Sequence, residues 1–171
     1  TNPAHYWRLG NIYVAQAKWD DAVINYQKAI DLKVDYYGAY IGLANAYEQT
    51  QKNDQAVVLY EKLINNKQTN PEILYNYGRL LYNRNIKGDR DTAQQIWLAV
   101  IQAQPNYSNA LYSLGLWNET HGDKNAALQY YYRVRDLNPT NQDILKKIQS
   151  LTGVSTSESA ATTSSEIKNK K

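Results

Sequence analysis

The sequence contains no cysteine, which excludes disulfide bonds, thiolate metal sites and thiol-based catalysis. It has only two histidines, His5 and His121, so a histidine-rich metal site or a Ser-His-Asp triad is disfavoured. Its apolar runs are only a few residues long, too short for direct insertion of this segment into a membrane. Phenylalanine and methionine are absent, while there are 16 tyrosines and 4 tryptophans. The aromatic packing must therefore come from rings that carry a polar edge.

The overall composition of the 171 residues is that of an ordinary folded domain, with 43% hydrophobic and 20% charged residues. A formal net charge of +3 is too small to indicate nucleic acid, and we expect no nucleic-acid partner. The start of the chain lacks the apolar core of a signal peptide, and Thr1 is not a translation start, so we expect a fragment or a processed chain. The sequence leaves the location open between the cytoplasm and a bacterial cell envelope.

A recurring residue pair divides the sequence into four similar stretches. Leu9-Gly10 is followed after 34 residues by Leu43-Ala44, after a further 34 by Tyr77-Gly78, and after 37 by Leu114-Gly115. Downstream of each pair comes a small residue followed by larger apolar ones: Ala22, Tyr26 and Ala29; Ala56, Tyr60 and Leu63; Ala93, Trp97 and Val100; Ala127, Tyr131 and Val134. These spacings of three and four residues predict two short amphipathic helices in each stretch.

The pattern resembles the tetratricopeptide repeat family, W-x2-L-G-x2-Y followed by A-x3-F and a proline, over about residues 3–141. The resemblance implies an all-α fold, namely a right-handed superhelical solenoid of helix-turn-helix repeats. The units it implies lie at about residues 3–36, 37–70, 71–107 and 108–141.

The chain after the fourth unit changes character twice. Residues 142–151 are amphipathic, and we expect a helix there that caps the last apolar surface. The N-terminus has no equivalent cap. Residues 152–171 are rich in serine and threonine and contain too little apolar area to offset the entropy of ordering, so we predict a disordered tail.

Local signals agree with helices at these positions. Asn2 and Asn70 stand just before Pro3 and Pro71, an arrangement typical of an N-cap followed by the first helical residue. The glycines of the repeated pairs fall inside the first helices, where glycine costs about 1 kcal/mol relative to alanine. A neighbouring helix that approaches closely would explain that cost.

Two stretches depart from the pattern. The third unit has three extra residues within about 84–87, which predict a lengthened first helix or a bulged turn. The fourth unit has Trp117-Asn118 where a small residue and tyrosine are usual, which predicts a rotated or loosened first helix.

Motifs for chemistry are not found. The glycines are isolated, with no phosphate-binding loop, and no serine has a histidine at a plausible spacing. Residues 83–91 weakly resemble a calcium loop but place Lys87 where a ligand oxygen is needed and lack the closing glutamate. We therefore expect no enzyme activity, no cofactor and no metal site.

The family resemblance implies that the first helix of each unit lines a concave groove. The candidate partner-binding residues on these helices are Trp7, Asn11, Ile41, Asn45, Glu48, Tyr75, Arg79, Tyr82, Tyr112, Leu116 and Glu119. Val14 and Gln49 lie on the same groove-facing sides of their helices.

Two kinds of groove are compatible with these residues. In the family's carboxylate clamp, asparagines and basic side chains hold a C-terminal carboxylate, and Asn11, Asn45 and Arg79 match three of its positions. Trp7 and Tyr75 replace the two lysines of that clamp, which removes the charge-assisted contacts. The alternative is an aromatic, nearly neutral groove, in which Glu48 and Glu119 oppose Arg79 and tryptophan and tyrosine anchor a partner.

The sequence therefore predicts a protein-interaction scaffold that holds an extended or helical protein segment with apolar anchors, with room for one basic residue. Two alternatives stay open. The chain could be a docking or regulatory appendage of a larger enzyme, including a membrane-anchored one. It could also be a structural scaffold that self-associates by stacking its uncapped N-terminal face end to end.

Overall fold

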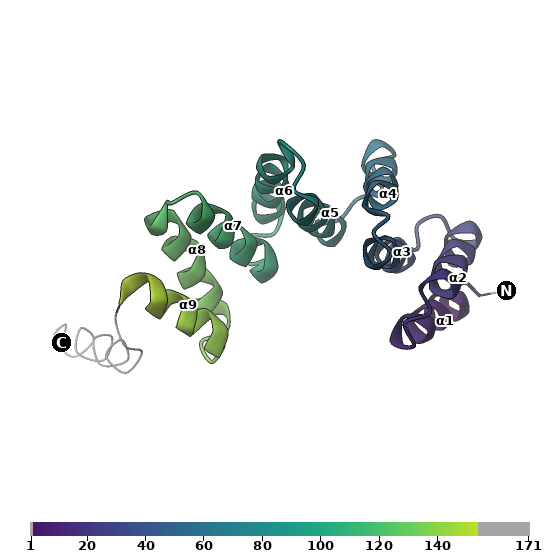
Figure 1. Cartoon of the computed structure of the whole chain (residues 1–171), viewed down its shortest axis with the longest axis horizontal. Coiled ribbons are helices and arrows are strands. Elements are labelled where there is room, and N and C mark those ends of the chain that lie inside the picture. The colour runs from purple at the N-terminus through teal and green to yellow at the C-terminus, as the bar shows by residue number, and fades with distance from the viewer. Residues whose placement is uncertain (1, 154–171) are drawn as a thin grey trace. The chain divides into compact units, whose positions relative to one another are not determined.

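The computed structural model describes residues 2–153, which form nine α-helices and contain no strand (Figure 1). In chain order these helices are α1 (Pro3–Ala15), α2 (Trp19–Leu32), α3 (Tyr37–Gln49), α4 (Asn53–Asn65), α5 (Pro71–Arg84), α6 (Asp89–Ala103), α7 (Ser108–Thr120), α8 (Lys124–Leu137) and α9 (Gln142–Thr152). The predicted all-α helical repeat is therefore confirmed.

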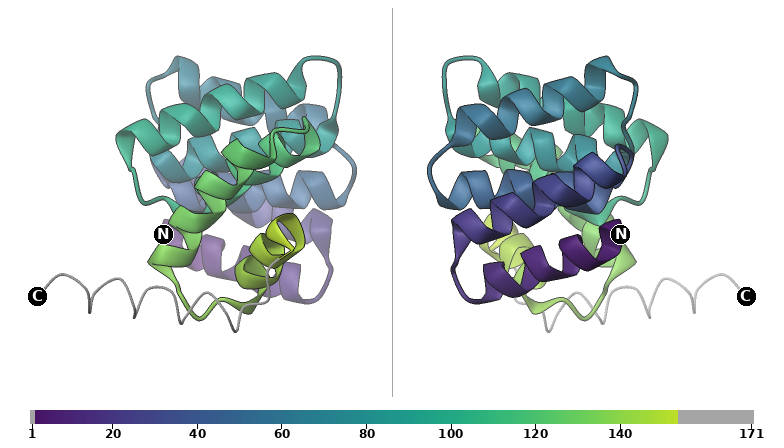
Figure 2. Two further views of the ribbon diagram at one scale, coloured as in Figure 1. Left: turned by 90° about the vertical axis from the view of Figure 1, so that its left-hand side faces the viewer. Right: turned by 90° about the vertical axis from the view of Figure 1, so that its right-hand side faces the viewer.

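The helices belong to two compact units that divide inside α6, between Ile96 and Trp97. The first unit contains α1 to α5 and the start of α6, and the second contains the end of α6 and α7 to α9. In the right-hand view of Figure 2, α1 and α2 run side by side in opposite directions, joined by a short turn.

Side-chain caps fix where several helices begin. The Asn2 Oδ1 atom accepts from the Ala4 N–H at 2.9 Å, and the Asn70 Oδ1 atom accepts from the Ile73 N–H at 2.8 Å. Both asparagines precede a proline whose fixed φ suits the first helical turn, as the sequence predicts. The Asn141 Oδ1 atom accepts from the Asp143 and Ile144 N–H groups and caps α9, which begins without a proline.

Close approach of helices explains two glycines of the first unit. The Tyr26 ring of α2 lies against both Gly10 of α1 and Gly42 of α3. A Cβ atom at either glycine would fall 2.6 Å or 2.5 Å from that ring, closer than atoms pack. The helices can pack around the ring only because these two positions carry no side chain.

The extra residues of the third unit are spread around the end of α5: α5 has 14 residues where α1, α3 and α7 have 13, and the turn that follows it, 85–88, is longer than the other turns within repeats. Asn85 adopts a left-handed conformation with φ 54° and ends the helix, and Gly88 follows with φ 89°. Arg84 donates to the Asp89 carboxylate from Nε at 2.8 Å and from an Nη atom at 3.0 Å. The Ile86 N–H donates to the same carboxylate at 3.2 Å, so the bulged turn is tied at both ends.

The fourth unit is not loosened at Trp117-Asn118. Helix α7 is continuous from Ser108 to Thr120, and the Asn118 side chain donates to the Leu114 carbonyl at 2.7 Å. The Trp117 ring stacks on His121 with a centroid distance of 3.8 Å. Helix α7 is therefore not loosened, because local contacts hold these side chains on a regular helix.

Helix α9 covers the apolar side of the second unit. Its Ile144 is buried in a cluster with Leu111, Tyr131 and Val134, against which Ile148 and Leu151 also pack. The helix extends to Thr152, one residue beyond the predicted cap, and ends at Gly153 with φ 72°. The rest of the predicted disordered tail, residues 154–171, lies outside the described residues.

Candidate binding groove

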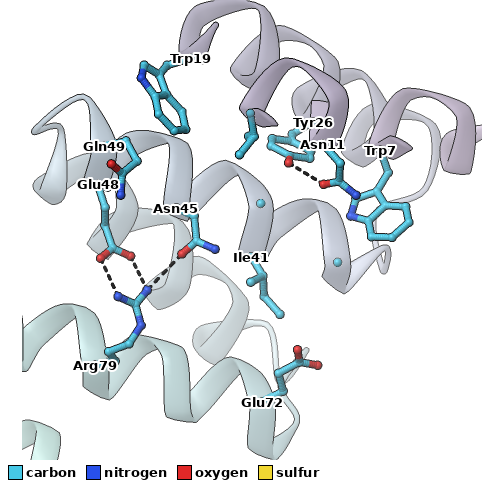
Figure 3. Close-up of a pocket in the computed structure, with 13 residues that line it drawn as sticks. Trp7, Asn11, Trp19, Tyr26, Ile41, Asn45, Glu48, Gln49, Glu72 and Arg79 are labelled. Atoms are coloured by element: carbon cyan, nitrogen blue, oxygen red, sulfur yellow. Dashed lines mark hydrogen bonds and ion pairs between the residues drawn. The ribbon is translucent and has the colours of Figure 1, made fainter. Parts of the chain in front are cut away.

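A hollow of about 470 Å³ lies in the first unit (Figure 3). Its walls come from α1, α2, α3 and α5. The lining residues are Trp7, Asn11, Val14, Trp19, Tyr26, Gly38, Ile41, Gly42, Asn45, Glu48, Gln49, Glu72 and Arg79.

Three aromatic residues contribute to the lining, and Figure 3 shows Trp7 and Trp19 on either side of Tyr26. The Trp7 ring meets the Tyr36 ring edge to face, with centroids 6.0 Å apart. Gly38 faces the same indole, and a Cβ atom there would lie 3.2 Å from its Nε1 atom. The absence of a side chain at Gly38 therefore leaves room for the Trp7 ring.

A partly buried hydrogen bond orients the asparagine of α1. The Tyr26 hydroxyl donates to the Asn11 Oδ1 atom at 2.7 Å. Burial raises the pKa of this hydroxyl above the ordinary tyrosine value, so it stays protonated and able to donate. The bond uses the Oδ1 atom of Asn11, which lines the hollow.

An ion pair forms the opposite wall. Arg79 of α5 donates to both carboxylate oxygens of Glu48 in α3, at 3.0 Å and 2.7 Å, and to the Asn45 Oδ1 atom at 3.0 Å (Figure 3). Burial alone would lower the pKa of Arg79, but the hydrogen bond and charge of Glu48 outweigh burial and raise it. The guanidinium is therefore fixed, charged and already matched by a carboxylate.

A second buried tyrosine, Tyr60, lies near the Arg79–Glu48 pair, and its hydroxyl has no hydrogen-bond partner. Tyr60 of α4 is fully buried, and its hydroxyl makes no hydrogen bond. Burial raises the pKa of this group well above the ordinary tyrosine value. Its ring packs on Tyr77 with a centroid distance of 5.7 Å.

The hollow contains six of the eleven predicted partner-binding residues: Trp7, Asn11, Ile41, Asn45, Glu48 and Arg79. Tyr75 and Tyr82 belong to α5 but do not line it. Arg90 lies over the Tyr82 ring, 5.0 Å from its centroid.

The other three predicted residues lie on α7 in the second unit, where they contact other residues of that unit. Tyr112 packs on Tyr131 with a centroid distance of 5.7 Å, and Leu116 packs on the buried cluster beneath α9. Glu119 accepts from the Tyr131 hydroxyl at 2.7 Å and pairs with Lys147 at 3.0 Å. The carboxylate of Glu119 is therefore matched within its own unit.

The sequence reasoning missed five lining residues: Trp19, Tyr26, Gly38, Gly42 and Glu72. Gly38 and Gly42 are four residues apart and share one face of α3. That spacing was a usable signal for a helix face that a bulky ring approaches. Trp19 opens α2 and Glu72 opens α5, and only the tertiary fold brings these helix ends to the hollow.

Residues 2–153 lack a metal-binding cluster and a membrane-spanning helix. Within that range no group of three or more histidine, aspartate or glutamate side chains could hold a metal ion. The segment that weakly resembles a calcium loop has Arg84 inserted between Asp54 and Asp89. None of the described helices is long and apolar enough to cross a lipid bilayer.

Comparisons with known families match most of the repeat region. Residues 10–51 match the family described as "TPR repeat", and residues 37–70 and 87–141 match models described as "Tetratricopeptide repeat". The chain is a tetratricopeptide repeat protein. A comparison with curated proteins gave no match.

Solved structures of tetratricopeptide repeat proteins share the fold. PilF of Pseudomonas aeruginosa is 22% identical with a TM-score of 0.74, over 87% of this chain and 67% of that one. A MamA protein is 18% identical with a TM-score of 0.69, over 87% and 80%. YrrB, described as having an unusual peptide-binding site, is 20% identical with a TM-score of 0.63, over 86% and 75%. The repeats and these neighbours support a general role as a protein–protein interaction scaffold.

Proposed function

We propose that the hollow of the first unit, which we call the α1–α3–α5 groove, binds a segment of a partner protein through apolar anchors and one basic residue. The observation that carries the proposal is the pairing of a half-buried tryptophan, Trp7, with an arginine that is already neutralised by Glu48. The half-buried ring of Trp7 favours apolar anchors, and the neutralised charge of Arg79 disfavours an anionic ligand.

The aromatic lining supplies the binding energy in this proposal. Trp7, Trp19 and Ile41 are half-buried, so a ligand would cover apolar surface that is now in contact with solvent. Each Å² of apolar surface removed from water contributes roughly 25 cal/mol, and rigid aromatic side chains lose little entropy on binding. An extended or helical segment with two apolar side chains would suit the size of the groove.

Charge determines the second part of the proposal. The lining contains the carboxylates of Glu48 and Glu72 and the guanidinium of Arg79, which together give a formal charge of −1. Arg79 already donates hydrogen bonds to Glu48 and Asn45, so a C-terminal carboxylate would have to displace the bidentate pair with Glu48. Glu72 is exposed at the groove and attracts a lysine or arginine of the partner.

The proposal assigns binding to this groove and no catalysis. Its lining contains no serine, lysine or histidine that could act as nucleophile or base.

We also infer four repeats at the predicted bounds, since α1–α2, α3–α4, α5–α6 and α7–α8 each fall within one of them.

A peptide-display selection on the full chain tests the proposal. Two libraries are used, one with random segments flanked by constant sequence and one with free C-terminal carboxylates. We expect motifs with apolar anchors and a basic residue from the first library. Selections on Ile41→Ala should lose them, whereas Ile24→Ala, an exposed isoleucine of α2 outside the groove, should retain them.

Two other results would contradict the proposal. Enrichment confined to free carboxylates would show that the Arg79–Glu48 pair opens for an anion. Enrichment that survives Ile41→Ala in full would place binding outside the groove. The exposed substitution Glu72→Lys leaves the core intact and should reverse the preference for a basic residue.

A further inference from the structure

The sequence after the described residues changes in composition near residue 166. Residues 155–165 contain only serine, threonine, alanine and one glutamate. Residues 166–171, which we call the Ile-Lys segment, read Glu-Ile-Lys-Asn-Lys-Lys. They supply every lysine after Gly153 and, in Ile167, the one apolar side chain larger than alanine after Val154. Apolar and basic side chains beyond the described residues are therefore concentrated in one short stretch.

The α1–α3–α5 groove offers an apolar counterpart to this segment. Trp7 and Ile41 are half-buried on its lining, so an isoleucine side chain placed there would remove apolar surface from water. The serine, threonine and alanine side chains of residues 155–165 carry too little apolar area to do the same. Ile167 is therefore the side chain of this stretch that suits the groove.

Glu72 supplies the charged counterpart. The other carboxylate of the lining, that of Glu48, already accepts from Arg79 at 3.0 Å and 2.7 Å. Among the residues that the structure describes, no basic side chain forms an ion pair with Glu72. Figure 3 shows Glu72 apart from the Arg79–Glu48 pair. A segment with three lysines and one glutamate complements this unmatched carboxylate.

The second unit already combines such side chains on the first helix of a repeat. Glu119 of α7 stands where α3 has Glu48, two repeats earlier. Lys147 of α9 pairs with the Glu119 carboxylate at 3.0 Å. Its neighbour Ile148 packs on the same buried cluster as Leu116 of α7. A lysine beside an isoleucine, from the chain that follows the repeats, thus matches a glutamate and an apolar surface of this unit.

We propose that the Ile-Lys segment binds in the α1–α3–α5 groove, with Ile167 on the apolar lining and a lysine at Glu72, and competes there with other protein partners. This inference rests on the proposed function of the groove and adds that the chain supplies a ligand of its own. Every copy of the chain carries both the groove and the segment. With one apolar anchor instead of two, the segment is a weak occupant that a stronger partner displaces.

A synthetic peptide tests the contact directly. It covers residues 162–171, with a fluorophore at its amino end and an amide at its carboxyl end, so that it offers no terminal charge. The receptor is the full chain with Ile167→Ser, whose own segment lacks the anchor. We expect saturable binding by fluorescence anisotropy, and we expect it to weaken about tenfold or more when the peptide carries Ile167→Ser.

Two charge reversals on the receptor separate a specific site from general attraction. Glu72 and Asp91 are both exposed and lie in the first turn of α5 and α6, but only Glu72 lines the groove. Glu72→Lys should weaken peptide binding about fivefold or more, whereas Asp91→Lys should change it by less than about twofold. Ile41→Ala should also weaken it, with circular dichroism checking that this receptor stays helical.

Competition in the full chain is the second measurement. The segment and an added partner peptide use the same groove, so only the fraction of chains with an empty groove can bind the peptide. Ile167→Ser should therefore tighten binding of a peptide from the display selection by about threefold or more. Val154→Ser removes the other larger apolar side chain after Gly153 and should leave that affinity unchanged.

Three results would overturn the proposal. The first is a receptor that binds display peptides but not the 162–171 peptide, which would leave the proposed function in place and reserve the groove for other partners. The second is peptide binding that Ile167→Ser in the peptide, or Glu72→Lys in the receptor, leaves unchanged, which would assign it to general charge attraction. The third is a receptor that binds neither kind of peptide, in which case the proposed function of the groove fails as well.

Discussion

Tyr26, Tyr60 and Tyr131 occupy the same position in the second helix of three repeats, yet their hydroxyl groups have different surroundings. All three rings are buried. The hydroxyl of Tyr26 donates to Asn11 and that of Tyr131 donates to Glu119, whereas that of Tyr60 makes no hydrogen bond. The repeat thus specifies a buried ring. The residue that faces the ring from the first helix decides how much the hydroxyl contributes to stability.

The comparison explains how a chain without phenylalanine builds its core. An aromatic ring is required where the family pattern has phenylalanine, and tyrosine fills that space. The extra oxygen stabilises the fold only where the neighbouring helix offers an acceptor. Three substitutions to phenylalanine and one pH titration test this interpretation.

The largest effect is expected at Tyr131. Tyr131→Phe removes a 2.7 Å hydrogen bond to the Glu119 carboxylate, and hydrogen bonds to charged groups contribute about 1.5–3 kcal/mol. The free energy of unfolding, measured by chemical denaturation, should fall by an amount in that range. A loss below about 0.5 kcal/mol would show that Lys147 and solvent satisfy Glu119 without the tyrosine.

A smaller loss is expected at Tyr26. Tyr26→Phe removes the bond to Asn11, a neutral pair, and such bonds contribute about 1 kcal/mol to stability. The same denaturation experiment measures it. An equal loss in an Asn11→Ala background would contradict the account, because the hydroxyl would then be stabilising through something other than Asn11.

Tyr60 should respond in the opposite direction. Tyr60→Phe removes a buried hydroxyl that has no partner, so unfolding should become less favourable by zero to about 1 kcal/mol. The ring contact with Tyr77 is retained. Destabilisation of this variant would mean that the hydroxyl has a partner in solution and would remove the contrast among the three tyrosines.

The smallest effect is a change in pH dependence. Burial would raise the pKa of Glu119, but hydrogen bonds from Tyr131 and Lys147 outweigh burial and lower it. The stability from this lowered pKa is complete above the pKa of the unfolded chain and is lost as pH falls through the folded value. Tyr131→Phe should raise the Glu119 pKa in a carboxyl NMR titration and flatten the loss of stability in acid, while Tyr26→Phe should change neither.

Much of the fold could be predicted from sequence because the repeat imposes the same requirements at fixed positions. The caps at Asn2 and Asn70 follow from local chemistry within one turn of helix. The extra residues of the third unit could be located but not assigned, since a longer helix and a bulged turn fit equally well. In the structure both α5 and the turn after it are longer, and the Arg84–Asp89 ion pair holds that turn.

The groove could be predicted only where one helix face carried the signal. Asn45 and Glu48 share a face of α3, so their place on the lining followed from helical spacing. The bidentate pair of Glu48 with Arg79 depends on how α3 and α5 pack, which no local spacing shows. The contact of Glu119 with Lys147 of α9 is likewise tertiary, and no local spacing shows it.

The four tryptophans offer the most direct test that the first unit holds the binding site. Trp7 and Trp19 line the groove, whereas Trp97 and Trp117 do not. The indole N–H signals of the full chain are recorded by NMR while the best peptide from the display selection is added. The account predicts that the Trp7 and Trp19 signals shift in proportion to binding while the other two stay in place. Shifts confined to Trp97 or Trp117 would contradict it.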